Sequence, residues 1–191
     1  MRVIHSTTGE MFGWPYPGPR FKSWRELVLD RFHRIGKSMQ QEGLEVTDFM
    51  AIVELVQTHS SVFDEIQQPC LLHGDLWLFN ILISQGEKAP NIVGILDVDR
   101  AWWGDPMADW LMHLLWIRRN EREWEKPQAA FWAAYGRKEQ SKMALFREVV
   151  YNAMHAGSVS IWASKNRNLD TVARAGRMLK KIGQTLSELI P

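Results

Sequence analysis

The sequence predicts an α+β protein that is predominantly helical and contains one small β element. Two observations predict this class. Apolar residues recur at the three- and four-residue spacing of amphipathic helices before residue 60 and after residue 127. Between these stretches, short apolar runs of the β type alternate with polar breaks over residues 70–98. The sequence shows no internal repeat and no dividing linker, so we expect a single domain over residues 1–191.

Size and composition narrow the functional class. A chain of 191 residues with 46% apolar content can bury one sizeable core. A net charge of +1 does not indicate binding to nucleic acid or to an anionic membrane. The single cysteine, Cys70, cannot form an internal disulfide and is interpreted as an inert thiol. No apolar run could span a bilayer and residues 1–5 do not open a signal peptide, so we expect a cytoplasmic protein.

The first half of the chain contains two predicted helices after an irregular start. Residues 1–22 are rich in Gly and Pro and are predicted to form an extended lead-in, neither strand nor helix. The capping box at residues 23–26 then begins a helix that should end near Glu42 and Gly43. A second helix is predicted from Thr47 to just before Ser60.

The second half is predicted to be helical apart from its turns. Asp105 followed by Pro106 is typical of a helix start, with Asp105 as the cap of a helix that runs toward Arg118 and Arg119. Later helical patterns cover residues 131–135, which end at Gly136, and also residues 143–163 and 169–190.

A β-hairpin is predicted in the middle of the chain. The apolar runs at residues 81–84 and 92–98 flank a polar connection that contains Gly and Pro. A further short strand, at Leu71 and Leu72, leads into His73. This arrangement places Asn80 and Asp97 at neighbouring strand ends.

The polar residues at these strand ends suit phosphoryl transfer. That reaction requires a carboxylate that orients a hydroxyl and takes its proton, and hard oxygen ligands that hold Mg²⁺ on nucleotide phosphates. Asp75 and Asn80 have the five-residue spacing of a kinase catalytic loop, with Gly74 in place of its arginine. Asp97, arriving from the next hairpin, can complete the metal site.

The segments HGDLWLFN (residues 73–80) and ILDVDRAWWGDPMAD (residues 95–109) resemble the catalytic core of the aminoglycoside phosphotransferase family. This kinase-like family also includes choline, homoserine and fructosamine kinases. The resemblance implies the C-terminal lobe of the protein-kinase-like fold and the use of ATP with Mg²⁺. It further implies that Asp75 is the catalytic base and that Asn80 and Asp97 are the Mg²⁺ ligands. His73 and Asp109 would then support the catalytic loop.

The N-terminal nucleotide-binding lobe of this family has no counterpart in the sequence. No Gly-rich strand–turn–strand precedes Trp24, and Lys22 and Glu26 are too close together to form the ion pair of that lobe. We therefore expect a truncated form of a longer kinase, or a single-lobe relative with lost or altered activity.

The acceptor is expected to be a small molecule with a hydroxyl, of a cationic or a sugar-like kind. Asp99 could attract a positive charge, and aromatic faces could stack on a sugar or surround a quaternary ammonium. The aromatic candidates beside the motifs are Trp77, Trp102 and Trp103. Packing in the core or at a lobe interface is the alternative explanation for these tryptophans.

Two functions of other classes remain open from the sequence. A catalytically silent module could keep the same scaffold and associate with a partner through the face that an N-terminal lobe would cover. A metal-dependent phosphohydrolase could use the same Asp and Asn ligands, although the sequence has no further cluster of His or carboxylates for a two-metal site.

Overall fold

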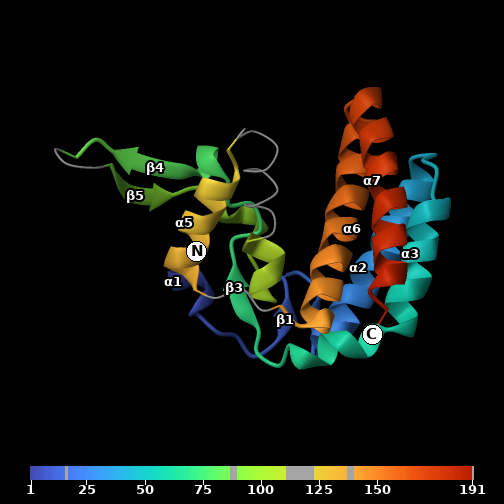
Figure 1. Ribbon diagram of the computed structural model, residues 1–191, viewed down its shortest axis with the longest axis horizontal. Coiled ribbons are helices and arrows are strands. Elements are labelled where there is room, and N and C mark those ends of the chain that lie inside the picture. The colour runs from blue at the N-terminus through green and yellow to red at the C-terminus, as the bar shows by residue number, and fades with distance from the viewer. Residues whose placement is uncertain (16, 87–89, 111–122, 137–139, 191) are drawn as a thin grey trace. The chain divides into compact units, whose positions relative to one another are not determined.

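The computed structural model describes residues 1–15, 17–86, 90–110, 123–136 and 140–190. The chain divides into two compact units (Figure 1). Unit 1 comprises Met1–Lys22 and Gln68–Lys138, and unit 2 comprises Ser23–Gln67 and Glu139–Pro191. Each unit is described by itself. Within the described residues, no helix is long and apolar enough to cross a membrane.

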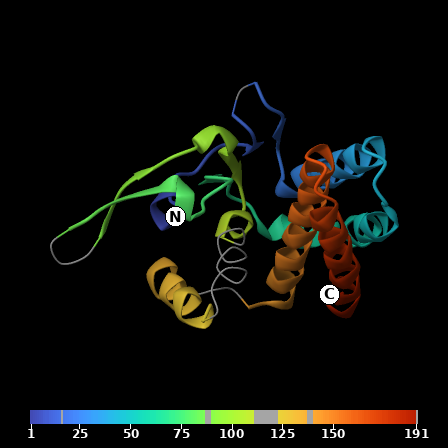
Figure 2. The same cartoon turned by 90° about the horizontal axis from the view of Figure 1, so that it is seen from above.

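Unit 2 is a bundle of helices. It contains α2 (Trp24–Gln41), α3 (Thr47–Thr58), the 3₁₀ helix η1 (Ser60–Glu65), α6 (Lys142–Lys165) and α7 (Leu169–Glu188). Helix α6 packs along α7 and α2, and α3 packs against α7 (Figures 1 and 2). The two predicted helices of the first half and the two long helices of the second half are thus confirmed. Their ends differ from the predicted ends by at most two residues.

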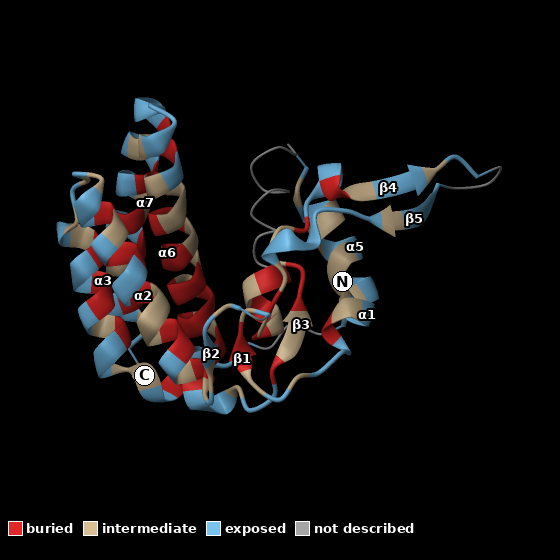
Figure 3. Ribbon diagram, turned by 180° about the vertical axis from the view of Figure 1, so that it is seen from behind, coloured by how far each residue is buried: buried red, intermediate tan, exposed pale blue. Residues whose placement is uncertain are grey.

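Local signals and apolar burial explain these helices. The side chain of Ser23 accepts a hydrogen bond from the N–H of Glu26 at 3.1 Å, so the capping box begins α2 as predicted. The buried faces of the helices meet in an aromatic core, where the rings of Phe32 and Phe49 stack with centroids 5.5 Å apart. The indole N–H of Trp24 donates to the hydroxyl of Tyr151 at 2.6 Å. Figure 3 shows that many residues of α6 are buried.

Unit 1 is built on a four-stranded antiparallel sheet with the order β2-β1-β6-β3. Its strands are β1 (Phe12–Gly13), β2 (Arg20–Phe21), β3 (Cys70–Leu72) and β6 (Trp102–Gly104). The register of β3 on β6 pairs Leu72 with Trp102 and Cys70 with Gly104. This pairing brings the strand before the catalytic loop beside the segment that leads to Asp109.

Unit 1 also contains elements that do not belong to this sheet. They are the short helix α1 (Arg2–His5), the 3₁₀ helices η2 (Leu78–Asn80) and η3 (Val98–Arg100), the hairpin strands β4 (Ile81–Ser84) and β5 (Asn91–Ile95), and α5 (Glu125–Tyr135). Strands β4 and β5 pair antiparallel, as predicted, with a register shift between Leu82 and Ile83. Helix α5 ends at Tyr135 with Gly136 as its C-cap, as predicted, but it begins at Glu125, six residues before the predicted start. The predicted helix after Asp105 falls largely on residues 111–122, outside the described residues.

The prediction that residues 1–22 contain neither strand nor helix is wrong. Residues 2–5 form α1, and β1 and β2 form a pair at the edge of the sheet. Thr8 bridges Cys70, and the N–H of Leu71 donates to the carbonyl of Thr7 at 2.8 Å. Partners that are distant in sequence thus supply the order that the local Gly- and Pro-rich sequence lacks. The prediction of a single domain stays a prediction.

Candidate active site

The catalytic-loop sequence begins directly after β3 and makes a sharp turn at Gly74. Gly74 has a φ of +79°, and a Cβ atom there would overlap the backbone carbonyl oxygen of Arg100. Only glycine meets both conditions without strain, because other residues rarely adopt positive φ and all have a Cβ atom. The close approach explains why glycine occupies this position, and it brings the loop against η3.

The side chain of Asp109 binds the backbone at the start of the loop. Its Oδ2 accepts from the N–H of His73 and its Oδ1 from the N–H of Gly74, both at 2.9 Å. Asp109 is 1% exposed, and this burial alone would raise the pKa of its carboxyl. Hydrogen bonds from His5 and the two loop amides outweigh burial, so the pKa of Asp109 is lowered. The arrangement fits the supporting role predicted for Asp109.

The His73 side chain links the loop to the segment before Asp97. Its Nδ1 accepts from the N–H of Asp75 at 3.3 Å, and its Nε2 donates to the carbonyl oxygen of Leu96 at 2.9 Å. An acceptor at Nδ1 and a donor at Nε2 are the two halves of one neutral tautomer. His73 is buried, which fits the supporting role predicted for it in the loop.

Asn80 joins the two ends of the loop. It is 7% exposed, and its amide nitrogen donates to the carbonyl oxygen of Asp75 at 2.9 Å. The backbone carbonyl oxygen of Asn80 accepts from the N–H of Leu96 at 2.9 Å. Asn80 is thus bonded to Asp75 on one side and to the neighbour of Asp97 on the other. Because the amide nitrogen is occupied, the amide oxygen is the atom with which Asn80 could face a cation.

Asp97 and Asp75 differ in their surroundings. Asp97 is exposed and lies in the left-handed region, with φ 62° and ψ 56°, a conformation that is uncommon outside glycine and often found at functional sites. Asp75 is half-buried, and its Oδ2 lies 3.3 Å from Nη1 of Arg100. This ion pair leaves Oδ1 as the other carboxylate oxygen that could meet a substrate.

The donor set suits a hard cation. Asn80 and Asp97 offer an amide oxygen and a carboxylate, the ligand types that Mg²⁺ prefers, and nucleotide phosphates and water supply the remaining ligands in kinase sites. The described residues contain no group of three or more His, Cys, Asp or Glu side chains that could hold a metal by itself. Asn80 and Asp97 are the residues that would hold such a cation together with the phosphates of a nucleotide.

The predicted acceptor residues have unequal exposure. Trp77 is 36% exposed and contacts Phe79, with ring centroids 4.7 Å apart, and Asp99 is exposed on η3. Trp102 is 8% exposed and its ring stacks on Trp14 with centroids 5.3 Å apart. The ring of Trp103 covers Gly9. Packing within the sheet accounts for Trp102 and Trp103, and a substrate role for either stays a prediction.

Sequence reasoning missed three residues at this site: His5, Arg100 and Tyr135. His5 is bonded to both Tyr135 and Asp109, and Arg100 pairs with Asp75. Of the three, only Arg100 lies within the motif segments of the sequence. The other two have no local signal, since neither belongs to a recognisable motif.

Cys70, just before the loop, fits its interpretation as an inert thiol. Burial, followed by the negative charge of Asp105, raises the pKa of its thiol. A raised pKa lowers the thiolate fraction at neutral pH and with it the reactivity.

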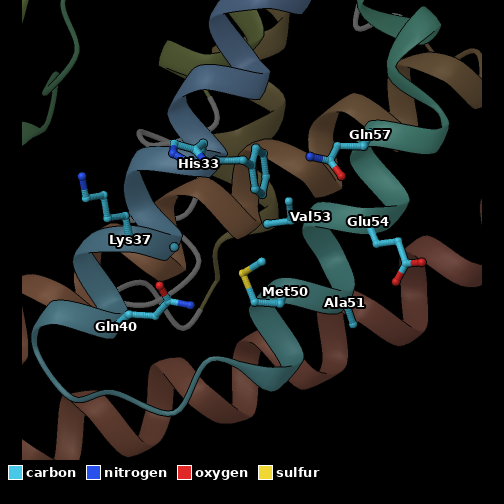
Figure 4. Close-up of a pocket in the computed structure, with 10 residues that line it drawn as sticks. His33, Lys37, Gln40, Met50, Ala51, Val53, Glu54 and Gln57 are labelled. Atoms are coloured by element: carbon cyan, nitrogen blue, oxygen red, sulfur yellow. The ribbon is translucent and has the colours of Figure 1, made fainter.

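A separate hollow of about 1030 Å³ lies in unit 2 between α2 and α3 (Figure 4). Phe32 and Val53 are among the residues that line it, and the side chains of Gln40, Met50 and Gln57 point into the gap between the helices. No catalytic-loop residue lines it.

Comparison with known proteins decides the family. The sequence profile of the phosphotransferase enzyme family (APH) matches residues 4–146, well over half of the chain. The chain belongs to this family. Over 98 residues the chain is 36% identical to a Vibrio cholerae protein named "Probable ketoamine kinase". That match covers 49% of the chain and 30% of the Vibrio cholerae protein.

Solved structures show the same fold. The apo form of a thermostable mutant of aminoglycoside phosphotransferase APH(4)-Ia matches with a TM-score of 0.63 at 17% identity, over 91% of this chain and 57% of that one. A ternary complex of a thermostable APH(4)-Ia mutant with AMP-PNP and hygromycin B matches with a TM-score of 0.64 at 16% identity, over 95% and 60%. The predicted α+β, kinase-like fold is confirmed. The chain spans only part of the length of each of these relatives.

Proposed function

We propose that this phosphotransferase chain carries the catalytic loop of an ATP-dependent small-molecule kinase. In this proposal Asp75 is the catalytic base, and Asn80 and Asp97 hold Mg²⁺. The observation that carries the proposal is the bonding of Asn80, which ties the backbone of Asp75 to the residue before Asp97. Membership of the phosphotransferase family supports the same reaction class.

The reaction would proceed as an in-line displacement. The acceptor hydroxyl oxygen forms a bond to the γ-phosphorus of ATP, the bond to the β–γ bridging oxygen breaks, and ADP leaves. The hydroxyl proton passes to Asp75, whose Oδ2 pairs with Arg100, which leaves Oδ1 as the accepting oxygen. Mg²⁺, when bound, would neutralise charge on the phosphates. The protein contributes positioning, and the loop bonds described above supply it.

The acceptor that we propose to test first is a ketoamine. The name of the Vibrio cholerae relative supports this class, and the APH(4)-Ia complex with hygromycin B supports sugar-like acceptors in general. Trp77 offers an exposed aromatic face and Asp99 an exposed negative charge. Together they suit an acceptor that combines a sugar with a protonated amine.

The decisive experiment replaces the base. Asp75→Asn and Asp75→Ala should each lower turnover by at least about 100-fold, because removal of a general base costs roughly 10²–10⁴ in rate. ADP release would be measured with ketoamines, amino sugars and amino alcohols, on this chain and on the longest protein that its gene encodes. Asp170→Asn, an exposed change on α7, is the control and should leave turnover unchanged. Undiminished turnover in Asp75→Ala would end the assignment of the base.

Metal binding has a separate readout. In calorimetric titration with Mg²⁺-ATP, Asp97→Asn should weaken binding, whereas Asp75→Asn should retain it, because only Asp97 is proposed as a ligand. Equal binding by the wild type and Asp97→Asn would contradict the ligand assignment.

One observation favours a second candidate function, a catalytically silent binding module. The hairpin and the catalytic loop expose many apolar side chains, namely Leu78, Phe79, Leu82, Ile83, Ile92, Val93, Leu96 and Val98. Exposed apolar surface of this extent is typical of interaction sites. A protein that shows no binding of Mg²⁺-ATP in the same titration would favour the module over the kinase.

A further inference from the structure

His5 is a buried polar residue with two partners that are distant in sequence. It is 7% exposed, its Nε2 lies 2.9 Å from Oδ2 of Asp109, and its Nδ1 lies 2.7 Å from the hydroxyl of Tyr135. The ring of His5 also meets the Tyr135 ring edge-on, with centroids 5.6 Å apart. The side chain is therefore fixed on both nitrogens.

The chemistry of the partners gives the bonds a direction. A carboxylate only accepts, so Nε2 of His5 carries the proton that it shares with Asp109. In the neutral ring Nδ1 is then the acceptor, and the Tyr135 hydroxyl donates to it. Burial, and then the negative groups of Asp105, Cys70 and Asp109, raise the pKa of the Tyr135 phenol. The phenol thus keeps its proton and remains a donor at neutral pH.

The chain of bonds ends at the catalytic loop. Asp109 uses the same Oδ2 to accept from the N–H of His73 and its Oδ1 to accept from Gly74. Four parts of unit 1 are therefore connected in sequence: α5, α1, the segment after β6, and the loop that carries Asp75. Among the described contacts of Tyr135 none is to Asp75, Asn80 or Asp97, and its hydroxyl reaches Asp109 through His5.

We propose that Tyr135 is a positioning residue of the catalytic loop. Its hydroxyl orients the His5 ring, and His5 in turn holds the Asp109 carboxylate against the N–H groups of His73 and Gly74. The proposal rests on the proposed function for its catalytic meaning, because it is Asp75 that the held loop presents. If Tyr135 has this role, helix α5, which lies outside the sequence motifs, helps to position the catalytic loop.

An alternative explanation is that Tyr135 contributes only packing. The Tyr135 ring stacks on Phe131 with centroids 5.3 Å apart, and this contact needs no hydroxyl. Tyr135→Phe removes a single oxygen and keeps the ring, so it separates the two explanations. Tyr151→Phe is the matched control, because it removes the hydroxyl that accepts from Trp24 within unit 2.

The test measures hydrogen exchange at the loop amides of the full chain. In Tyr135→Phe the amides of His73 and Gly74 should exchange about 3- to 10-fold faster, the effect of one lost neutral hydrogen bond on local opening. Tyr151→Phe should leave them within twofold of the wild type. His5→Phe should accelerate them more than Tyr135→Phe does, and His5→Gln, which keeps a donor for Asp109, should largely restore the wild-type rate.

A spectroscopic readout accompanies the exchange data. The ¹⁵N shifts of the His5 ring, assigned by their loss in His5→Gln, should report a proton on Nε2 in the wild type, and the Nδ1 shift should change in Tyr135→Phe because Nδ1 loses its hydrogen-bond donor. Unchanged exchange together with an unchanged Nδ1 shift in Tyr135→Phe would overturn the proposal. If His5→Phe does not fold, the other variants still decide. No phosphoryl transfer is needed, so an inactive kinase would leave this result intact.

Discussion

Asp109 shows how one buried side chain can set the geometry of residues that are more than 30 positions away. Its two oxygens accept from His5, His73 and Gly74, and these bonds keep the carboxylate ionised in spite of its burial. The sequence motif indicates that an acid belongs here. It does not indicate that a histidine from the N-terminal segment is among its donors.

Gly74 provides a prediction at the residue scale. Gly74→Ala should destabilise unit 1 more than Gly136→Ala does, because both positions have positive φ but only Gly74 faces a backbone oxygen. The strain at Gly136 should cost about 1 kcal/mol, and the clash at Gly74 should add about 1–3 kcal/mol. Chemical denaturation followed by tryptophan fluorescence would measure both variants. Equal losses would show that the loop relaxes away from Arg100.

At the scale of elements, close packing of α6 depends on a small residue. A Cβ at Gly157 would lie 2.6 Å from Cγ2 of Ile35 and 2.9 Å from Cε2 of Phe49. Both contacts are tighter than van der Waals packing allows. Gly157 thus allows α6 to lie directly on α2 and α3, and no helical periodicity reveals this requirement.

The matching prediction compares two helical glycines. Gly157→Ala should lower the free energy of unfolding of unit 2 by about 1–3 kcal/mol through overpacking. Gly176→Ala on α7 should instead raise it by about 0.5–1 kcal/mol, because a Cβ there meets nothing within 4 Å and alanine favours the helix. Thermal unfolding followed by far-UV circular dichroism would show shifts of opposite sign. A stabilising Gly157→Ala would refute the packing described for α6.

At the scale of the whole molecule, the lowered pKa of Asp109 links stability to pH. The unfolded chain binds a proton at the usual carboxyl pKa of 3.8, whereas the folded chain binds it only at lower pH. The stabilisation from this group is therefore complete above the usual value and is lost as the pH falls through the folded pKa.

The prediction concerns Asp109→Asn. At pH 7 this variant should be less stable by on the order of 2 kcal/mol, because an amide cannot accept from all three donors. The difference in the free energy of unfolding between the variant and the wild type should become smaller as the pH is lowered below 3.8. Tryptophan fluorescence is a suitable probe, since eight of the ten tryptophans fall in the ranges of unit 1. Asp170→Asn should show no such narrowing, and a gap independent of pH would contradict the assigned shift.

Local signals in the sequence determined most of the elements and the motif residues. The capping box, the apolar periodicities and the polar hairpin connection each act within about ten residues, so α2, α3, α6, α7 and the β4–β5 pair could be predicted. The spacing of Asp75, Asn80 and Asp97 likewise predicted the candidate site. Their joint role in binding and catalysis stays a prediction.

Only the tertiary structure decided what surrounds these residues. The pairing of β6 with β3 covers Trp102, and His5 reaches Asp109 and Tyr135 across 104 and 130 positions of the chain. Such contacts depend on how distant segments pack, and a single sequence carries no local pattern for them. The sequence by itself therefore determined which groups could perform the chemistry, whereas the fold decided which side chains hold them in place, because positioning is a property of contacts between segments.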